Sequence, residues 1–290
     1  MRRSTPRPVF DRKPTIIPNE DARHHVWGDV ESGMVSDRVF LSTDALHVLE
    51  YQLGPGNQFR HSPMNATIFA ADVIYIVLEG NLVITNPETG EVLPVGTGEA
   101  VLFHRDTWHH GYNPSLTESV RVLEFMSPPP SRGTASDYAR KQPFLETSSF
   151  TDERWSNRWP SAKDEQHQSR TLHLVSPQEY LWSFAAESVH HLQGTLVDSE
   201  FLTAKRGTVN PGNFEEFRTI EHESAIYCTG GRLWIDIRDP ETEAFTVATL
   251  DVGDVAYLPA GCESRMLVRD SVPAEYFLGT GKLMAESWMP

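Results

Sequence analysis

The chain has little cysteine, few basic residues and no long apolar run, and each shortage excludes a class of protein. Two cysteines in 290 residues cannot form a disulfide framework or a thiolate zinc site. The 25 lysines and arginines are outnumbered by 40 aspartates and glutamates, which gives a formal net charge of −15. A polyanion of this kind repels nucleic-acid phosphates and anionic lipid surfaces, so we expect neither a nucleic acid nor a membrane as partner.

No stretch approaches the ~18 consecutive apolar residues of a membrane-spanning helix. The basic N-terminus, residues 1–8, is not followed by the apolar segment of a secretory signal. Hydrophobic residues still make up 39% of the chain and aromatic residues 10%, which is enough for a buried core. We therefore expect a folded cytoplasmic protein, with a length that suits two modules of about 100–200 residues.

Short apolar segments separated by Gly, Pro and Asn turns predict β-strands throughout residues 46–126. No helical pattern lies between these segments, which indicates an antiparallel sandwich or barrel. The same kind of pattern returns after residue 195. The strands expected in the first half are residues 48–53, 73–78, 82–84, 100–103 and 120–125.

Residues 127–194 form a predicted connector, rich in Pro, Ser, Arg and Glu at its start. A short helix is expected near Ser136–Gln142, ending before a proline. A second helix is expected from Ser176, with Glu179 placed for a capping box and Gly194 as its stop. Its apolar stripe would be Leu181, Phe184, Ala185, Val189 and Leu192.

The two halves of the chain repeat the same landmarks in the same order. The first half has Gly80–Ile84, a Pro-Glu-Thr turn at 87–89 and then Gly98–Leu102. The second half has Gly231–Ile235, a Pro-Glu-Thr turn at 240–242 and then Gly253–Tyr257. Loop-length variation between conserved strands explains the slightly different spacing. We interpret the sequence as a tandem duplication of one β-barrel.

Residues 98–113 resemble the second motif of the cupin superfamily, G-x5-P-x-G-x2-H-x3-N, with Gly98, His109 and Asn113 at its Gly, His and Asn positions. His104 and Asp106 replace the Pro and Gly of the motif. The chain thus resembles a bicupin over roughly residues 46–126 and 195–279. The resemblance implies an all-β fold of two tandem cupin jelly-roll (double-stranded β-helix) barrels, with one or two connecting helices. The implied parts are an N-terminal arm (1–45), an N-terminal barrel (46–126), the connector (127–194) and a degenerate C-terminal barrel (195–280).

In the cupin family, three histidines and one glutamate usually hold a divalent metal inside the barrel. The first family motif, G-x5-H-x-H-x(3,4)-E-x6-G, is weak here: Gly56 and His61 begin it, and Asp72 lies one place from the position of the glutamate. The resemblance therefore implies one Fe, Mn or Zn ion at His109 and His61, with Asp72 or His104 as further candidates. His61 could equally be a solvated loop residue, His104 a substrate contact, and Asp72 an exposed carboxylate at a strand start.

The second copy departs further from the motifs, since Ser224, Ser264 and Val268 occupy its ligand and Asn positions. We expect the C-terminal barrel to hold no metal. Three aromatic residues would line or rim the cavity of the first barrel and contact the substrate, namely Tyr75, Trp108 and Tyr112.

The resemblance implies a metal-dependent enzyme with a single site in the N-terminal barrel. Its substrate would be a small organic molecule, aromatic or partly apolar, as for a dioxygenase-like oxidoreductase. Two alternatives stay open: a non-catalytic small-molecule-binding cupin, and a metal-independent sugar isomerase or epimerase that uses His, Asp or Tyr for proton transfer. Association into a homodimer is suggested by analogy with other bicupins.

Overall fold

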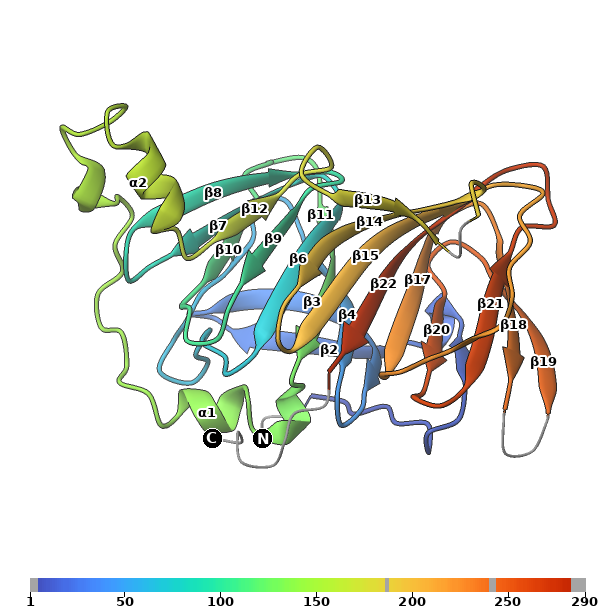
Figure 1. The fold of residues 1–290 in the computed structure, drawn as a ribbon. Coiled ribbons are helices and arrows are strands. Elements are labelled where there is room, and N and C mark those ends of the chain that lie inside the picture. The colour runs from blue at the N-terminus through green and yellow to red at the C-terminus, as the bar shows by residue number, and fades with distance from the viewer. Residues whose placement is uncertain (1–4, 186–187, 240–243, 283–290) are drawn as a thin grey trace.

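The computed structural model describes residues 5–185, 188–239 and 244–282, and most of the regular secondary structure in these ranges is β-strand. Within these ranges the α-helices are two short ones, α1 (Ser136–Ala139) and α2 (Lys163–Gln168). No helix in the described ranges is long and apolar enough to cross a bilayer. Figure 1 shows two barrels side by side, with the helices at the outer end of the N-terminal one.

The N-terminal barrel consists of a seven-stranded and a four-stranded antiparallel sheet. In spatial order the large sheet contains β12 (His173–Val175), β9 (Ala100–Phe103), β6 (Asp72–Glu79), β11 (Val120–Ser127), β4 (His47–Leu53), β3 (Gly33–Ser42) and β2 (Arg23–Asp29). The small sheet contains β5 (Gln58–Phe59), β10 (His110–Tyr112), β7 (Asn81–Asn86) and β8 (Glu91–Gly96).

The C-terminal barrel has the same two-sheet arrangement. Its large sheet contains β1 (Thr15–Ile17), β20 (Val255–Leu258), β17 (Ser224–Gly230), β22 (Ala274–Gly281), β15 (Leu202–Val209), β14 (His191–Asp198) and β13 (Leu181–Phe184). Its small sheet contains β16 (Arg218–Thr219), β21 (Glu263–Leu267), β18 (Leu233–Arg238) and β19 (Phe245–Leu250). The all-β tandem-barrel fold expected from the repeat is confirmed.

Gly80 and Gly231, the first residues of the repeated landmarks, occupy turns whose backbone conformation requires glycine. Gly80 and Gly231 follow equivalent strands and have φ angles of 80° and 64°. A β-carbon at either position would lie within 3 Å of a carbonyl oxygen, that of Ser119 or of Pro273. Only glycine fits such a turn without strain. The first Pro-Glu-Thr turn joins β7 to β8, whereas the second, 240–242, lies outside the described residues.

In each barrel, one edge strand of the large sheet comes from a segment outside the repeated sequence. β1, near the N-terminus, pairs with β20 of the C-terminal barrel, with Thr15 opposite Tyr257. β12, from the connector, pairs with β9 of the N-terminal barrel. The segment suggested as an N-terminal arm also supplies β2 and β3, which extend the large sheet of the first barrel. These strand pairings attach the connector and the N-terminal segment to the barrels.

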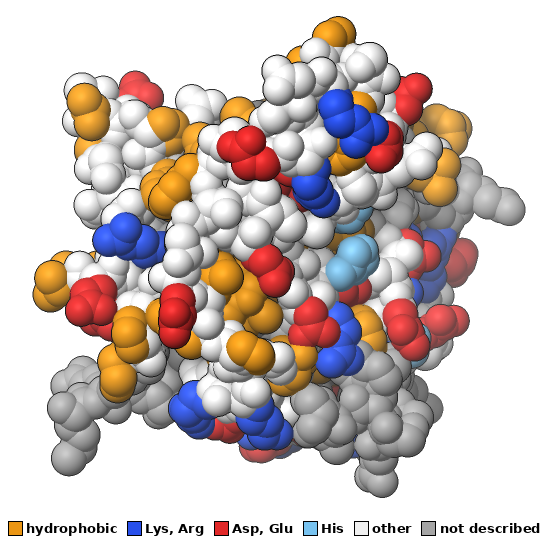
Figure 2. Space-filling view, turned by 90° about the vertical axis from the view of Figure 1, so that its left-hand side faces the viewer, with side chains coloured by type: hydrophobic (Ala, Val, Ile, Leu, Met, Phe, Trp, Pro, Cys, Tyr) orange, Lys and Arg blue, Asp and Glu red, His pale blue; other side chains and the backbone are white. Residues whose placement is uncertain are grey.

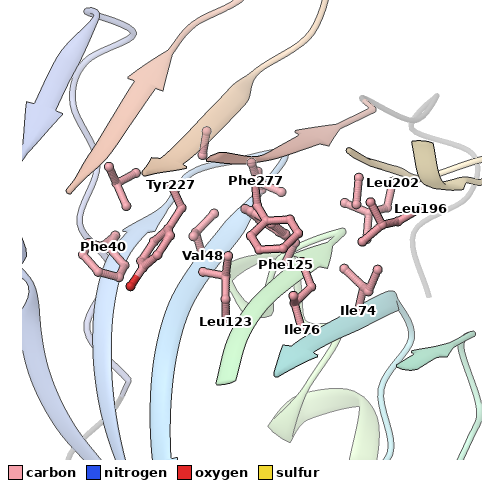
Figure 3. Close-up of a cluster of buried hydrophobic side chains, with 14 of the residues drawn as sticks. Phe40, Val48, Ile74, Ile76, Leu123, Phe125, Leu196, Leu202, Tyr227 and Phe277 are labelled. Carbon is pink, nitrogen blue, oxygen red and sulfur yellow. The ribbon is translucent and has the colours of Figure 1, made fainter. Parts of the chain in front are cut away.

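The two large sheets pack against each other through a shared apolar layer. Figure 3 shows Phe125 of β11 and Phe277 of β22 pointing toward one another, with aliphatic side chains from both barrels around them. Phe125 is fully buried, and its ring lies against Gly279, where a β-carbon would come within 2.2 Å of a ring carbon. Phe40 and Tyr227 meet edge to face with centroids 5.8 Å apart. Close packing of this kind makes the layer intolerant of lost volume.

One buried ionised side chain, that of Glu50, makes a hydrogen bond across this layer. Glu50 of β4 is 3% exposed and accepts hydrogen bonds from Arg121 at 3.0 and 3.1 Å and from the Tyr227 hydroxyl, in the other barrel, at 2.6 Å. Burial opposes ionisation of Glu50, but these bonds outweigh it and lower its pKa. The carboxylate therefore stays charged and couples the two barrels.

The helix expected from Ser176 to Gly194 is wrong. Glu179 does accept hydrogen bonds from the backbone nitrogen and hydroxyl of Ser176, at 3.0 and 3.1 Å, but this contact closes only a turn. The following residues form β13 and pair with β14, with Phe184 opposite Leu192. The apolar stripe was compatible with both structures, and pairing with an available sheet edge decided the outcome. The shorter helix is confirmed as α1, which covers the first part of Ser136–Gln142.

We predict that Phe125→Ala lowers the free energy of unfolding by about 3–5 kcal/mol, because it opens a cavity in the apolar layer between the barrels. Chemical denaturation followed by tryptophan fluorescence measures the change. Phe150→Ala is the matched control, since Phe150 is 62% exposed and its loss should change stability by no more than about 0.5 kcal/mol. Equal effects of the two substitutions would contradict the role assigned to this layer.

Candidate functional site

The alternation of side chains along each strand divides the N-terminal barrel into an inner and an outer face. On β6, Val73, Tyr75 and Val77 belong to the apolar cluster inside the barrel. Ile74 and Ile76, between them, belong to the layer shared with the other barrel. Successive residues on a strand point to opposite faces, so this parity decides which predicted site residues can meet inside.

His109 lies inside the barrel and is 1% exposed. Its ring is enclosed by four aromatic rings, with the centroid of Phe103 at 4.2 Å, Phe69 at 5.1 Å, and Phe59 and Tyr75 at 6.0 Å. Nδ1 lies 3.3 Å from the Thr107 carbonyl oxygen, and Nε2 lies 3.4 Å from the Tyr75 hydroxyl. Burial lowers the pKa of His109 to about 4, so the ring is neutral at pH 7.

His61 does not reach His109 but pairs with His110. Its Nδ1 lies 2.6 Å from Nε2 of His110, and its Nε2 lies 2.7 Å from the carbonyl oxygen of Leu145 in the connector. Because that carbonyl can only accept, Nε2 of His61 carries the proton, and the proton of His110 Nε2 is donated to Nδ1 of His61. Burial lowers the pKa of both rings, that of His110 to about 3. The pair is neutral, and its nitrogens are committed to this chain of hydrogen bonds.

Asp72 and His104 form a separate pair on the outside of the barrel wall. His104 Nδ1 lies 2.8 Å from Oδ1 of Asp72, and the histidine side chain is 51% exposed. Asp72 shares the parity of Ile74, so it points away from the interior. The hydrogen bond that His104 donates to Asp72 raises the pKa of His104. This is the ordinary behaviour of an ion pair at a strand end.

The four residues expected to hold a metal therefore lie in three places. Within the described ranges, no group of three His, Cys, Asp or Glu side chains is arranged to hold a metal ion. At His109 the surrounding side chains are aromatic, and the ring of Phe59, on the strand beside β10, lies 6.0 Å from the histidine ring. The residues present do not fit a three-histidine, one-carboxylate metal centre.

The three aromatic residues expected to contact substrate also separate. Only Tyr75 lies inside the barrel. Trp108 packs with Ile68 and lines a surface pocket of about 280 Å³, together with Phe144 of the connector. Tyr112 alternates with Gly111, which touches the Phe59 ring inside the barrel, so Tyr112 faces the opposite side of the small sheet. Figure 2 shows this end of the molecule, where hydrophobic side chains form small patches between charged ones.

A buried polar cluster inside the same barrel was missed from the sequence. The inner polar cluster, as we name it here, is built from residues on β2, β3, β4, β6 and β11, namely His25, Asp37, His47, Tyr51, Tyr75 and Glu124. The strand register places Glu124 opposite Tyr75, and Asp37 opposite both His25 and Tyr51. His25 Nδ1 lies 2.9 Å from the carboxylate of Asp37. The rings of Tyr51 and Tyr75 are 5.2 Å apart and connect the cluster to His109.

The cluster contains more buried polar groups than it can pair internally. His47 Nδ1 and the Tyr51 hydroxyl are buried without a hydrogen-bond partner among the described residues. Burial, reinforced by the nearby Asp37, raises the pKa of Glu124 to about 8, so this carboxyl group carries a proton at pH 7. Burial also raises the pKa of Asp37, against the opposing hydrogen bond from His25. Unpaired polar groups in a core are costly, and they mark functional sites more often than ordinary cores.

One signal in the sequence could have found the cluster. On β11, Val120, Val122 and Met126 point inward, and Glu124 occupies the same face. A carboxylate at an inward position of an otherwise apolar strand requires a specific partner or a function. The motif comparison directed attention to histidines instead.

We predict that the His47→Leu variant loses less of its free energy of unfolding than the wild type does when the pH is lowered. Burial lowers the pKa of His47 from 6.5 to about 4, so the neutral ring stabilises the fold above pH 6.5 and this contribution is lost as the pH falls toward 4. The full shift corresponds to about 3 kcal/mol. Urea unfolding at pH 7, 6, 5 and 4.5 should show a smaller decrease in the free energy of unfolding for His47→Leu than for the wild type. His24→Leu, at an exposed histidine, should leave the decline unchanged, and a steeper decline for His47→Leu would refute the assignment.

We also predict that His109→Ala does not change the metal content of the protein. The rings around His109 belong to Phe and Tyr residues and supply no further His, Cys, Asp or Glu ligand, so we expect the substitution to remove no metal centre. Elemental analysis of protein purified without a histidine tag measures this. About one metal ion per wild-type chain that disappears in His109→Ala would show that the ring is a ligand after all.

No protein-family model matches the sequence, and no curated protein matches it. Solved structures do match. A putative glyoxylate-induced protein from Pseudomonas aeruginosa is 13% identical with a TM-score of 0.66, and the match covers 98% of this chain and 95% of that one. Oxalate decarboxylase from Lactobacillus farciminis is 12% identical with a TM-score of 0.62, covering 92% of this chain and 86% of that one. AerE from Microcystis aeruginosa is 11% identical with a TM-score of 0.58, covering 90% and 98%. At these identities the likeness shows the fold alone, and that fold is the tandem double-barrel (bicupin) fold.

Proposed function

We propose that the N-terminal barrel is the active site of an enzyme that transfers protons to and from a small organic molecule, with Glu124 as the principal acid. The observation that carries the proposal is the presence of two buried carboxyl groups, Glu124 and Asp37, in one barrel interior. Burial raises the pKa of both groups, and the charge of Asp37 raises that of Glu124 further, to about 8, which suits Glu124 to act as an acid.

Each member of the inner polar cluster has a role in this proposal. Glu124 is protonated below about pH 8 and can donate a proton to an oxygen of the substrate. Asp37 and His25 are joined by a 2.9 Å hydrogen bond and can accept a proton as a pair. Tyr51 and Tyr75 keep their protons because burial raises their pKa well above 10, so they can only orient a substrate by hydrogen bonding. His47 offers an unpartnered nitrogen to the same ligand.

The side chains inside the N-terminal barrel, as metal ligands or as proton donors and acceptors, favour one of the functions that the sequence suggests over the others. A metal-dependent dioxygenase would need several ligands at His109, and its neighbours are aromatic rings. Proton transfer by His, Asp and Tyr, the isomerase or epimerase alternative, needs the kind of groups that the inner polar cluster contains. The similar structures include oxalate decarboxylases, which are named for a small organic acid and support a substrate of small size.

We predict that Glu124→Gln abolishes proton exchange in a bound substrate. The wild type, incubated in D2O with a panel of small 2-hydroxy acids, 2-oxo acids and sugars, should exchange a carbon-bound hydrogen next to an oxygenated carbon in one of these classes. Proton NMR follows the loss of the C–H signal. Glu124→Gln should slow the exchange about 100-fold or more, and the wild-type rate should fall above about pH 8, where Glu124 loses its proton.

Glu118→Gln is the matched control, because Glu118 is exposed and lies on the loop before β11. An unchanged exchange rate in Glu124→Gln would refute the assigned role. Binding of a panel compound without exchange would favour the non-catalytic binding protein instead. Independently of any substrate, the carboxyl carbon of Glu124 should titrate near pH 8 in a ¹³C NMR experiment on labelled protein.

A further inference from the structure

A second cavity lies at the junction of the two barrels, away from the inner polar cluster. The N-terminal segment just before β1 covers it, and its floor is formed by Glu223, which directly precedes β17, and by Tyr257 of β20. Its volume is about 340 Å³, which is within the lower range of small-molecule sites. Phe10 of the covering segment packs on Tyr257, with ring centroids 5.8 Å apart, and makes one wall apolar.

Glu223 is the unusual group in this cavity. Its side chain is 6% exposed, yet Oε2 has no hydrogen-bond partner among the described residues. A buried carboxylate oxygen without a donor costs free energy that a folded protein normally avoids. Asp72, at the start of β6 in the other barrel, has His104 as its hydrogen-bond partner, whereas Oε2 of Glu223 has none in the described chain.

The charges around the cavity favour a cationic ligand. Two arginines and three carboxylates line it, which leaves a formal charge of −1. Arg7 is already paired with Asp44 at 2.6 Å, and Arg12 is exposed at the rim. The whole chain, at −15, adds a negative field that attracts cations.

We propose that this cavity binds a small organic ammonium ion, whose N–H groups donate to Glu223 while its apolar part lies against Phe10 and Tyr257. The ammonium group supplies the donors that the buried carboxylate lacks. The site does not depend on the function proposed for the N-terminal barrel, from which its lining residues are separate.

Isothermal titration calorimetry with phenethylammonium tests this site on the full chain. The wild type should bind phenethylammonium and not phenylacetate, which has the same ring and the opposite charge. Glu223→Gln should weaken phenethylammonium binding at least about tenfold, because a charged hydrogen bond is lost. Glu221→Gln, at an exposed glutamate two residues away, should bind as the wild type does. Absence of wild-type binding, or equal binding of both ions, would overturn the proposal.

A second variant keeps the test decisive if Glu223→Gln does not fold. Arg12→Ala removes an exposed positive charge at the rim and should tighten phenethylammonium binding about two- to fivefold. Unchanged or weaker binding in Arg12→Ala would contradict a cation-selective site. Glu223→Gln itself should unfold at the same temperature as the wild type or higher, since it removes an unpaired buried charge. A lower unfolding temperature would show that Glu223 has a structural partner and would count against the ligand.

Discussion

The packing of the two large sheets against each other is the constraint on which the rest of the molecule depends. Each of these sheets has two apolar faces, one toward its own barrel and one toward the other barrel. This double burial explains why residues 73–78 read as a continuous apolar run rather than an alternating one. It also explains how one buried carboxylate, Glu50, is tolerated: Tyr227 reaches across from the second barrel to satisfy it.

Both faces of the large sheets are buried, so polar side chains on these sheets need a hydrogen-bond partner or a function. The two barrels differ in whether such partners are present. In the C-terminal barrel, Gly207 leaves room for the ring of Tyr276, whose hydroxyl lies 2.6 Å from Nε2 of His191. Nδ1 of that histidine contacts Glu215, so every ring nitrogen is paired and the interior is filled. In the N-terminal barrel, Tyr51 and His47 keep unpartnered polar atoms. Among the described residues, His191 inside the C-terminal barrel thus has a partner at both ring nitrogens, whereas His47 inside the N-terminal barrel does not.

The likeness to oxalate decarboxylase and to the glyoxylate-induced protein, at 12% and 13% identity, concerns the fold alone. A cupin barrel is specified by its strand order, its turn glycines and its apolar inner face. Those requirements leave the identity of single inward residues free. Phe59 beside His109 is one such inward residue, and its aromatic ring fills the interior of the barrel there. The chemistry therefore has to be argued from the inward residues of this chain.

The sequence alone determined the duplicated β-barrel, because strand alternation and turn glycines are local properties. It also identified His109 as an inward residue. It could not decide the structure of 176–194, where an apolar stripe suits a helix or a strand until a sheet edge is available. Nor could it assemble His25 and Asp37, on the hairpin of β2 and β3, with Glu124 of the distant strand β11, because they meet only through strand register. Tertiary structure decided the candidate site, because burial and the proximity of charges do not exist before the barrel closes.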